Sequence, residues 1–218
     1  AISGDEEGEV GRLCIQKAAK VGIVCLLDQT EQLRVLQTIL KDRTTEHSDF
    51  VFYADRLMRL VVEEALNQLP VTAVTITTPT GCKYKGLTFA RGNCGVSLCR
   101  SGEAMEMALR QCARSIRICK MLIGDELRML YARLTSDIAS RRVLLLYPII
   151  STGQTVLKAI SALSASGVHE ENLYLVALFA QPQSIERISK HYPLVTIIVS
   201  EITTSVPHNF AMKYFGTD

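Results

Sequence analysis

The chain has 218 residues, of which 48% are hydrophobic and 21% are charged, and these values exclude a largely disordered or low-complexity protein. The length suits one domain with a sizeable core. Because 24 basic residues nearly balance 22 acidic ones and no apolar run approaches the roughly 18–20 residues of a membrane helix, neither nucleic acid nor a membrane is expected as a partner.

The first half of the chain predicts an arm, two helices and a hairpin. Residues 1–20 show no clear period and predict a weakly ordered N-terminal arm. Apolar residues then recur at helical spacing in two segments, and alternating branched residues flank a Pro-Thr-Gly turn. In chain order, the two helices and the two strands of the hairpin cover residues 31–42, 49–69, 72–78 and 82–89. We expect this hairpin, at about residues 72–89, to be an appendage of a single domain spanning residues 21–218.

From residue 94 onward, apolar strand-like runs alternate with helical segments. The strand-like runs cover residues 94–99, 115–123, 143–146, 173–179 and 195–200. The helical segments cover residues 102–114, 156–166 and 184–191, and a short polar tail follows. Strands that are apolar throughout and alternate with helices predict an α/β fold in which helices flank both faces of a parallel sheet.

Two loops follow strands in this pattern, at the end of a sheet where α/β proteins bind ligands. Arg100, Ser101 and Gly102 place a guanidinium beside backbone N–H groups at the predicted start of a helix, which favours an anion. The alternative is a tight turn that carries a surface arginine.

The second loop joins the strand at residues 143–146 to the helix at residues 156–166. Its small and polar residues can present successive N–H groups and hydroxyls to one phosphate. They are Ser151, Thr152, Gly153, Gln154 and Thr155. The loop lacks the Gly-Lys-Ser/Thr ending of a Walker A motif, and an ordinary helix N-cap is the alternative.

The seven cysteines include no Cys-x-x-Cys pair and no His at the spacing of zinc ligands, so no metal site is expected. Most lie in apolar surroundings, where a thiol behaves as a small hydrophobe. Residues 5–9 are mostly acidic, and no apolar signal segment accompanies them. We expect reduced thiols in a cytoplasmic protein, with the nucleus as the alternative compartment.

Several motifs occur in a fixed order along the chain. They are Phe-Val-Phe-Tyr-Ala-Asp-Arg-Leu-Met-Arg-Leu at residues 50–60, Cys-Gly-Val-Ser at 94–97 with Arg-Ser-Gly-Glu at 100–103, Arg-Ile at 117–118 and Tyr-Phe-Gly-Thr at 214–217. Together they resemble the uracil phosphoribosyltransferases over most of the chain. The resemblance implies the type I phosphoribosyltransferase fold. It also implies a reaction of pyrimidine salvage that joins uracil to phosphoribosyl pyrophosphate (PRPP), giving UMP and pyrophosphate.

The resemblance further implies roles for the two loops. Arg100 would neutralise the departing pyrophosphate, with Ser101 and Gly102 beside it and Mg²⁺ accompanying PRPP. The rest of the PRPP site would be Tyr147, Ser151, Thr152, Gly153, Gln154 and Thr155, in which N–H groups of the loop bind the 5′-phosphate. Arg100 and Tyr147 would be the catalytic positions.

Three departures from the family pattern fall in this site. An acidic residue before the proline of the phosphate loop is replaced by Tyr147, a phenol that is neutral at pH 7. The base-recognition segment has lost its two acids and several glycines; its altered positions are Asn209, Phe210, Ala211 and Met212. The loop after residue 123 is short and carries acids where the family has a basic residue. We therefore expect uracil transfer to be weak or lost.

The resemblance also implies a homo-oligomer, either a dimer or a tetramer, and GTP as an allosteric activator. The positions that match the GTP site are His47, Arg56, Arg91, Gly92, Asn93, Arg117 and Arg141, for which exposed or ion-paired surface residues are the alternative. Relatives often hold the pyrophosphate loop with a non-proline cis peptide, so we expect one at Arg100–Ser101. The terminal residues 214–217 should be ordered against the sheet.

Three hypotheses stay open at this point. The first is a uracil phosphoribosyltransferase that makes UMP slowly. The second is a catalytically inactive regulatory protein that binds a nucleotide or a phosphoribosyl group. The third is a phosphoribosyltransferase that uses another base.

Overall fold

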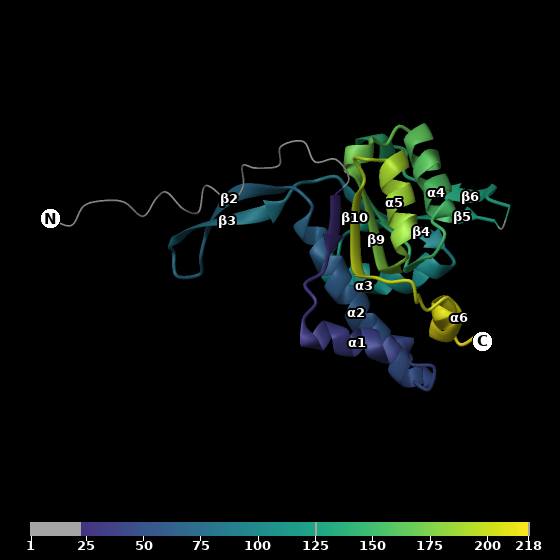
Figure 1. Cartoon of the computed structure of the whole chain (residues 1–218). Coiled ribbons are helices and arrows are strands. Elements are labelled where there is room, and N and C mark those ends of the chain that lie inside the picture. The colour runs from purple at the N-terminus through teal and green to yellow at the C-terminus, as the bar shows by residue number, and fades with distance from the viewer. Residues whose placement is uncertain (1–22, 125, 218) are drawn as a thin grey trace.

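The computed structural model describes residues 23–124 and 126–217, so the arm predicted over residues 1–20 lies outside the described residues. Its central sheet has the order β1-β10-β9-β7-β4-β5-β6, with the short β8 paired to β9. The strands are β1 Ile23–Leu26, β4 Asn93–Cys99, β5 Arg117–Ile123, β6 Met129–Arg133, β7 Arg142–Leu146, β8 Ile149–Ile150, β9 Leu173–Ala180 and β10 Thr196–Ile202. All neighbours pair in parallel except β5 and β6. The predicted α/β fold with a mainly parallel sheet is confirmed (Figure 1).

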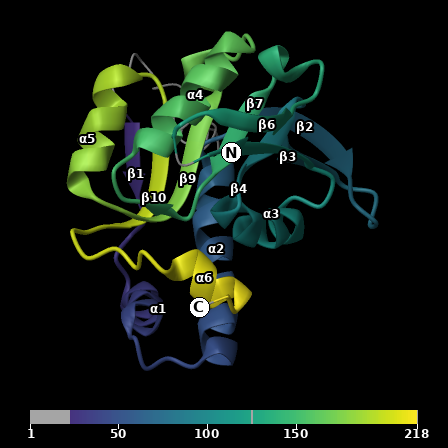
Figure 2. The same cartoon turned by 90° about the vertical axis from the view of Figure 1, so that its right-hand side faces the viewer.

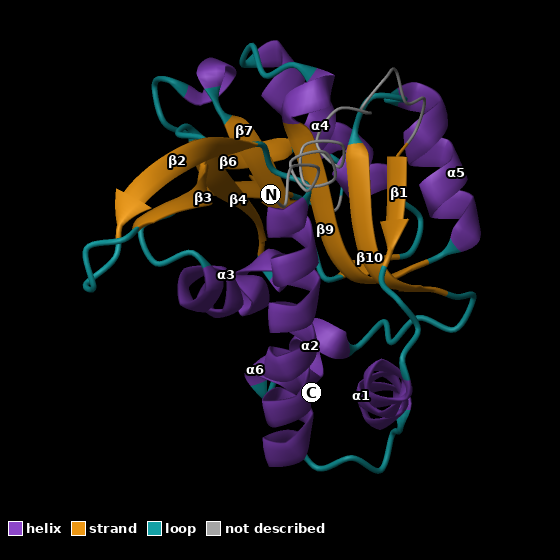
Figure 3. Ribbon diagram, turned by 90° about the vertical axis from the view of Figure 1, so that its left-hand side faces the viewer, coloured by secondary structure: helices purple, strands orange, loops and turns teal. Residues whose placement is uncertain are grey.

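Helices cover both faces of this sheet. They are α1 Glu31–Lys41, α2 His47–Asn67, α3 Glu106–Cys112, α4 Gln154–Ala165, α5 Pro182–His191 and α6 Phe210–Phe215, together with the 3₁₀ turns η1 Ser101–Met105, η2 Ile138–Ser140 and η3 Glu170–Asn172. Figure 2 shows α4 in front of the sheet, and Figure 3, from the opposite side, shows α2 in front. No helix in the described part of the chain combines the length and apolarity needed to cross a membrane.

Alternate residues of the strands feed two separate hydrophobic clusters. On β7, Leu144 and Leu146 join the cluster formed with α1, α2, α3 and α6, which we call the α2 cluster. Val143 and Leu145 join the cluster formed with α4 and α5, the α4 cluster. This division follows from strand geometry, in which successive side chains point to opposite faces.

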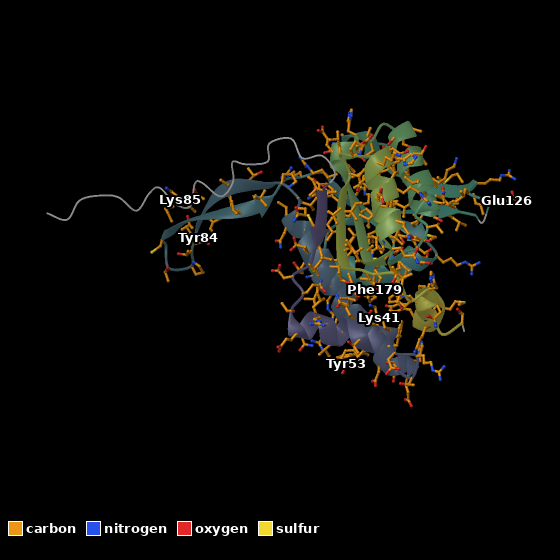
Figure 4. All side chains as sticks on the ribbon, viewed as in Figure 1. Lys41, Tyr53, Tyr84, Lys85, Glu126 and Phe179 are labelled. Atoms are coloured by element: carbon orange, nitrogen blue, oxygen red, sulfur yellow. The ribbon has the colours of Figure 1, made fainter. Side chains whose placement is uncertain are left out.

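The predicted hairpin is confirmed as β2 Val71–Thr77 and β3 Lys83–Phe89, an antiparallel pair separate from the main sheet. It extends away from the body (Figure 1). Figure 4 shows Tyr84 and Lys85 on this hairpin and Glu126 at the opposite end of the molecule.

Three local predictions were wrong. The segment at residues 102–114 begins as the 3₁₀ turn η1 before α3 forms, and β1, β6 and β8 were not predicted at all. The polar tail contains α6, which packs mainly on α2 and η1. The Tyr214 hydroxyl donates a hydrogen bond of 2.7 Å to Asp55 Oδ1 of α2, so the C-terminus is ordered against a helix because its aromatic rings find their apolar partners there.

Candidate active site

The two predicted anion loops lie side by side at the carboxyl ends of two neighbouring central strands. Strands β4 and β7 are parallel neighbours, with Ser97 opposite Leu146, and each loop follows its strand directly. Gly102 lies against the Leu146 carbonyl, so a Cβ added at this glycine would overlap the carbonyl oxygen and lie 3.2 Å from Ser97 Oγ. Only a glycine lets the Arg100 loop pack this closely on the end of β7, next to the start of the phosphate loop.

The Arg100 loop presents an unpaired cation. A non-proline cis peptide is present, but it joins Cys99 to Arg100, so the predicted position at Arg100–Ser101 was wrong by one bond. The Arg100 side chain is exposed, and no carboxylate among the described residues forms an ion pair with it. Its guanidinium is therefore available for two parallel hydrogen bonds to a phosphate group.

The phosphate loop is shaped by Gly153, whose φ of 77° is left-handed and favours glycine. This residue precedes α4, which starts two residues earlier than predicted, at Gln154. The Gln154 N–H donates to Thr152 Oγ1 at 3.4 Å. The N-cap residue of α4 is Gly153, which has no side chain to cap the helix, so the first-turn N–H groups lack a side-chain cap from that position.

Helix α5 holds the phosphate loop from behind. Arg187 Nη1 donates to the Thr152 carbonyl at 2.7 Å, and the buried Ser184 Oγ donates to the Ile150 carbonyl at 3.3 Å. A Cβ at Gly153 would lie 3.3 Å from Ser184 Cβ. Sequence reasoning missed these contacts, because the spacing within α5 reports a buried face but not the loop on which that face packs.

Tyr147 occupies the position where the family carries an acid. Its side chain is half-buried and packs against the α4 cluster. Burial raises the pKa of its phenol, and a hydrogen bond with Thr155 opposes that shift only in part. A neutral phenol thus stands where the resemblance implies a carboxylate for the ribose hydroxyls.

The predicted base-binding positions do not face one pocket together. The Phe210 ring is fully buried in the α2 cluster, with its centre 5.3 Å from that of Phe50. Asn209 and Met212 are exposed, and Ala211 is half-buried. Phe210 therefore anchors the segment and cannot stack its ring on a base. Because α6 contacts η1, the segment still lies beside the Arg100 loop.

Four of the seven predicted GTP positions line one cavity of about 570 Å³ at the base of the hairpin; they are Arg91, Gly92, Asn93 and Arg141. Arg141 is already paired with Asp137 through two hydrogen bonds of 2.9 and 2.6 Å. The cavity therefore presents fewer unpaired cations than the sequence suggested.

The other three GTP positions lie elsewhere within the chain. Arg117 lines a separate cavity of about 400 Å³ beside β6. His47 Nε2 lies 3.3 Å from the carbonyl oxygen of Tyr214, and the Arg56 guanidinium lies 5.9 Å from the centre of the Tyr53 ring. GTP activation stays a prediction, as does the oligomeric state.

The residues present do not fit a resident Mg²⁺ ion. The described residues contain no group of three His, Cys, Asp or Glu side chains that could hold a metal. Residues 147–155 carry no carboxylate, although protein sites for Mg²⁺ normally supply one or two. Mg²⁺ accompanying PRPP stays a prediction.

The arginine loop and the hydroxyl-rich glycine loop follow neighbouring strands of a mainly parallel sheet. This arrangement is that of the type I phosphoribosyltransferases. Residues 27–214 match the sequence profile of uracil phosphoribosyltransferase. The chain belongs to the uracil phosphoribosyltransferase family.

Individual relatives agree with this assignment. The chain is 51% identical over 198 residues to a uracil phosphoribosyltransferase homolog of Danio rerio, covering 88% of this chain and 77% of that protein. It is 50% identical to the Homo sapiens homolog, covering 88% of this chain and 64% of that protein. It is 44% identical to a uracil phosphoribosyltransferase of Dictyostelium discoideum, covering 89% of this chain and 97% of that protein. The solved structure of the AQ2163 protein from Aquifex aeolicus shares the fold, with a TM-score of 0.77 at 16% identity. The match covers 90% of this chain and 99% of that chain.

Proposed function

We propose that this protein binds PRPP and transfers its phosphoribosyl group to uracil slowly, giving UMP and pyrophosphate as a salvage reaction. The observation that carries the proposal is the contact between Gly102 and the end of β7. This contact holds the unpaired Arg100 next to the phosphate loop, so that one donor molecule can reach both.

The chemistry fits these two ends. N1 of uracil attacks C1′ of the donor, the bond from C1′ to the pyrophosphate oxygen breaks, and its electron pair leaves with the pyrophosphate. The N1 proton passes to solvent. Arg100 stabilises the charge that develops on pyrophosphate. The N–H groups near Gly153 bind the 5′-phosphate, and this remote binding orients the ribose for attack.

Two features make the transfer slow. Tyr147 supplies no negative charge to the cationic sugar in the transition state, and loss of one such stabilising group costs about 10²–10³ in rate. The base segment, Pro207-His208-Asn209-Phe210-Ala211-Met212, contains neither an acidic residue nor a glycine, so it lacks the family's pattern of acids and closely approaching backbone donors. The neutral phenol of Tyr147, in place of a carboxylate, favours one alternative, a protein that binds PRPP or UMP without turnover.

The test measures binding and turnover together. Calorimetry with PRPP and with UMP reports binding, and radiolabelled UMP formation from uracil, with and without GTP, reports turnover. We expect binding of both ligands and slow turnover that Arg100→Ala abolishes and that Arg110→Ala, an exposed arginine on α3, leaves unchanged. Binding without turnover supports the alternative. A chain that binds neither ligand refutes the proposal.

A further inference from the structure

Lys120 on β5 holds two carboxylates that lie next to the Arg100 loop. Its Nζ is 2.6 Å from Glu103 Oε1 and 3.3 Å from Glu106 Oε1. Glu103 belongs to η1, and Glu106 is the first residue of α3. The Lys120 side chain is 43% exposed, so the cluster is accessible to solvent, and Lys120 lies within ion-pair distance of both carboxylates.

The spacing of Glu103 would otherwise make it a partner of Arg100. The two residues are three apart at the start of a 3₁₀ turn, and the Glu103 N–H donates to the Arg100 carbonyl at 3.0 Å. In a 3₁₀ helix, side chains at positions i and i+3 lie above one another. A carboxylate in that place could pair with the guanidinium and remove the positive charge that an anion needs.

The structure shows the other pairing. Glu103 bonds Lys120, and Arg100 has no ion-pair partner in the described part of the chain. Lys120 emerges from β5 opposite Ser97 of β4, three residues before Arg100. Its ammonium group therefore reaches η1 from the neighbouring strand, where it contacts Glu103 and Glu106.

We propose that Lys120 is a positioning residue of the donor site, which binds Glu103 and Glu106 and thereby keeps the Arg100 guanidinium unpaired for the pyrophosphate group. This inference rests on the proposed function, because the pyrophosphate group is that of PRPP. Without Lys120, two uncompensated carboxylates remain beside the loop. Glu103 then pairs with Arg100, and both acids repel the incoming anion.

Calorimetry with inorganic pyrophosphate and with UMP separates this role from a structural one. UMP has no pyrophosphate group, so its binding reports on the phosphate loop and the base segment and not on contacts of Arg100 with pyrophosphate. For Lys120→Met we expect pyrophosphate binding to weaken about tenfold, while UMP binding changes less than twofold. Adding Glu103→Gln to that variant should restore most of the lost affinity, and Lys120→Arg should retain it.

The controls address charge and folding. Lys85→Met removes the same charge from the exposed hairpin, far from the body (Figure 4), and should leave pyrophosphate binding unchanged. Lys120→Gln is a second, polar variant that should weaken pyrophosphate binding to the same extent. It takes the place of Lys120→Met if that variant does not fold.

Three outcomes overturn the inference. The first is pyrophosphate binding that is unchanged in Lys120→Met and Lys120→Gln. The second is an equal loss of pyrophosphate and UMP binding that Glu103→Gln does not reverse, which would identify a purely structural role. If the unaltered chain binds neither pyrophosphate nor PRPP, the proposed function fails first and the inference fails with it.

Discussion

Gly102→Ala tests whether the two loops form one site. The Cβ of an alanine would overlap the Leu146 carbonyl oxygen, which is backbone at the end of β7 and cannot rotate away, and would lie 3.2 Å from Ser97 Oγ. To accept the methyl group, η1 must move off the strand, and Arg100 moves with it. The substitution therefore separates Arg100 from the phosphate loop.

The expected loss of stability follows from the kind of contact that the added methyl group makes. Adding one methyl group to a tightly packed site typically costs about 1–3 kcal/mol. A domain of about 200 residues loses about 2–4 °C in Tm for each kcal/mol, so a cost of about 2 kcal/mol predicts a fall of about 4–8 °C. We also expect PRPP binding to weaken at least about tenfold, because a shift of about 1 Å in a binding group has effects of this size or larger.

Gly86→Ala on β3 is the matched control. Its added Cβ would lie 2.8 Å from Tyr84 Cε1, which belongs to an exposed ring that can rotate away. Thermal unfolding and PRPP calorimetry are measured on both variants. We expect Gly86→Ala to match the unaltered chain in both. If the two variants have the same Tm, or if Gly102→Ala binds PRPP with unchanged affinity, the two loops do not form one site in the way argued.

Three further predictions concern side chains around the sheet. Arg187→Ala removes the hydrogen bond to the phosphate-loop carbonyl and should weaken UMP binding about fivefold, the value of a hydrogen bond worth about 1 kcal/mol, with little change in Tm; unchanged affinity contradicts it. Iodoacetamide at pH 8, followed by mass spectrometry, should label the exposed Cys82 and spare Cys94, because burial raises the pKa of Cys94 to about 12. The hydrogen bond from Arg141 lowers the pKa of Asp137 from 3.8 to about 2, so this pair stabilises the fold above pH 3.8 and loses that effect as the pH falls toward 2. Asp137→Asn should therefore flatten the acid-unfolding curve between these values.

The sequence predicts the elements whose burial follows a simple period. Phe50, Leu57 and Val61 of α2 lie on one face and are all buried. Strand β9 is buried along its whole length, as an apolar run predicts for a central parallel strand. Strand β6 was not predicted because it is an antiparallel edge strand that is exposed along almost its whole length. Its sequence therefore shows no alternation of apolar and polar residues.

The candidate site is predictable only in part, for a related reason. Loops that follow strands are visible in a sequence, so Arg100 and the residues around Gly153 could be placed at one sheet edge. The side chains that hold these loops come from distant segments: Arg187 reaches the loop from α5, and Lys120 reaches η1 from β5. Such contacts depend on how whole elements pack, and no spacing in the sequence encodes them.

The two hydrophobic clusters explain how this chain combines an intact phosphate loop with an altered base segment. Ile150 and Val156, on either side of the loop, are buried in the α4 cluster. Val206 and Phe210, which anchor the base segment, are buried in the α2 cluster on the opposite face of the sheet. Because β7 separates the clusters, substitutions around Phe210 need no repacking around Ile150. If the proposed donor site is correct, binding of the donor phosphate and recognition of the base can therefore change independently, because the two segments pack in different clusters.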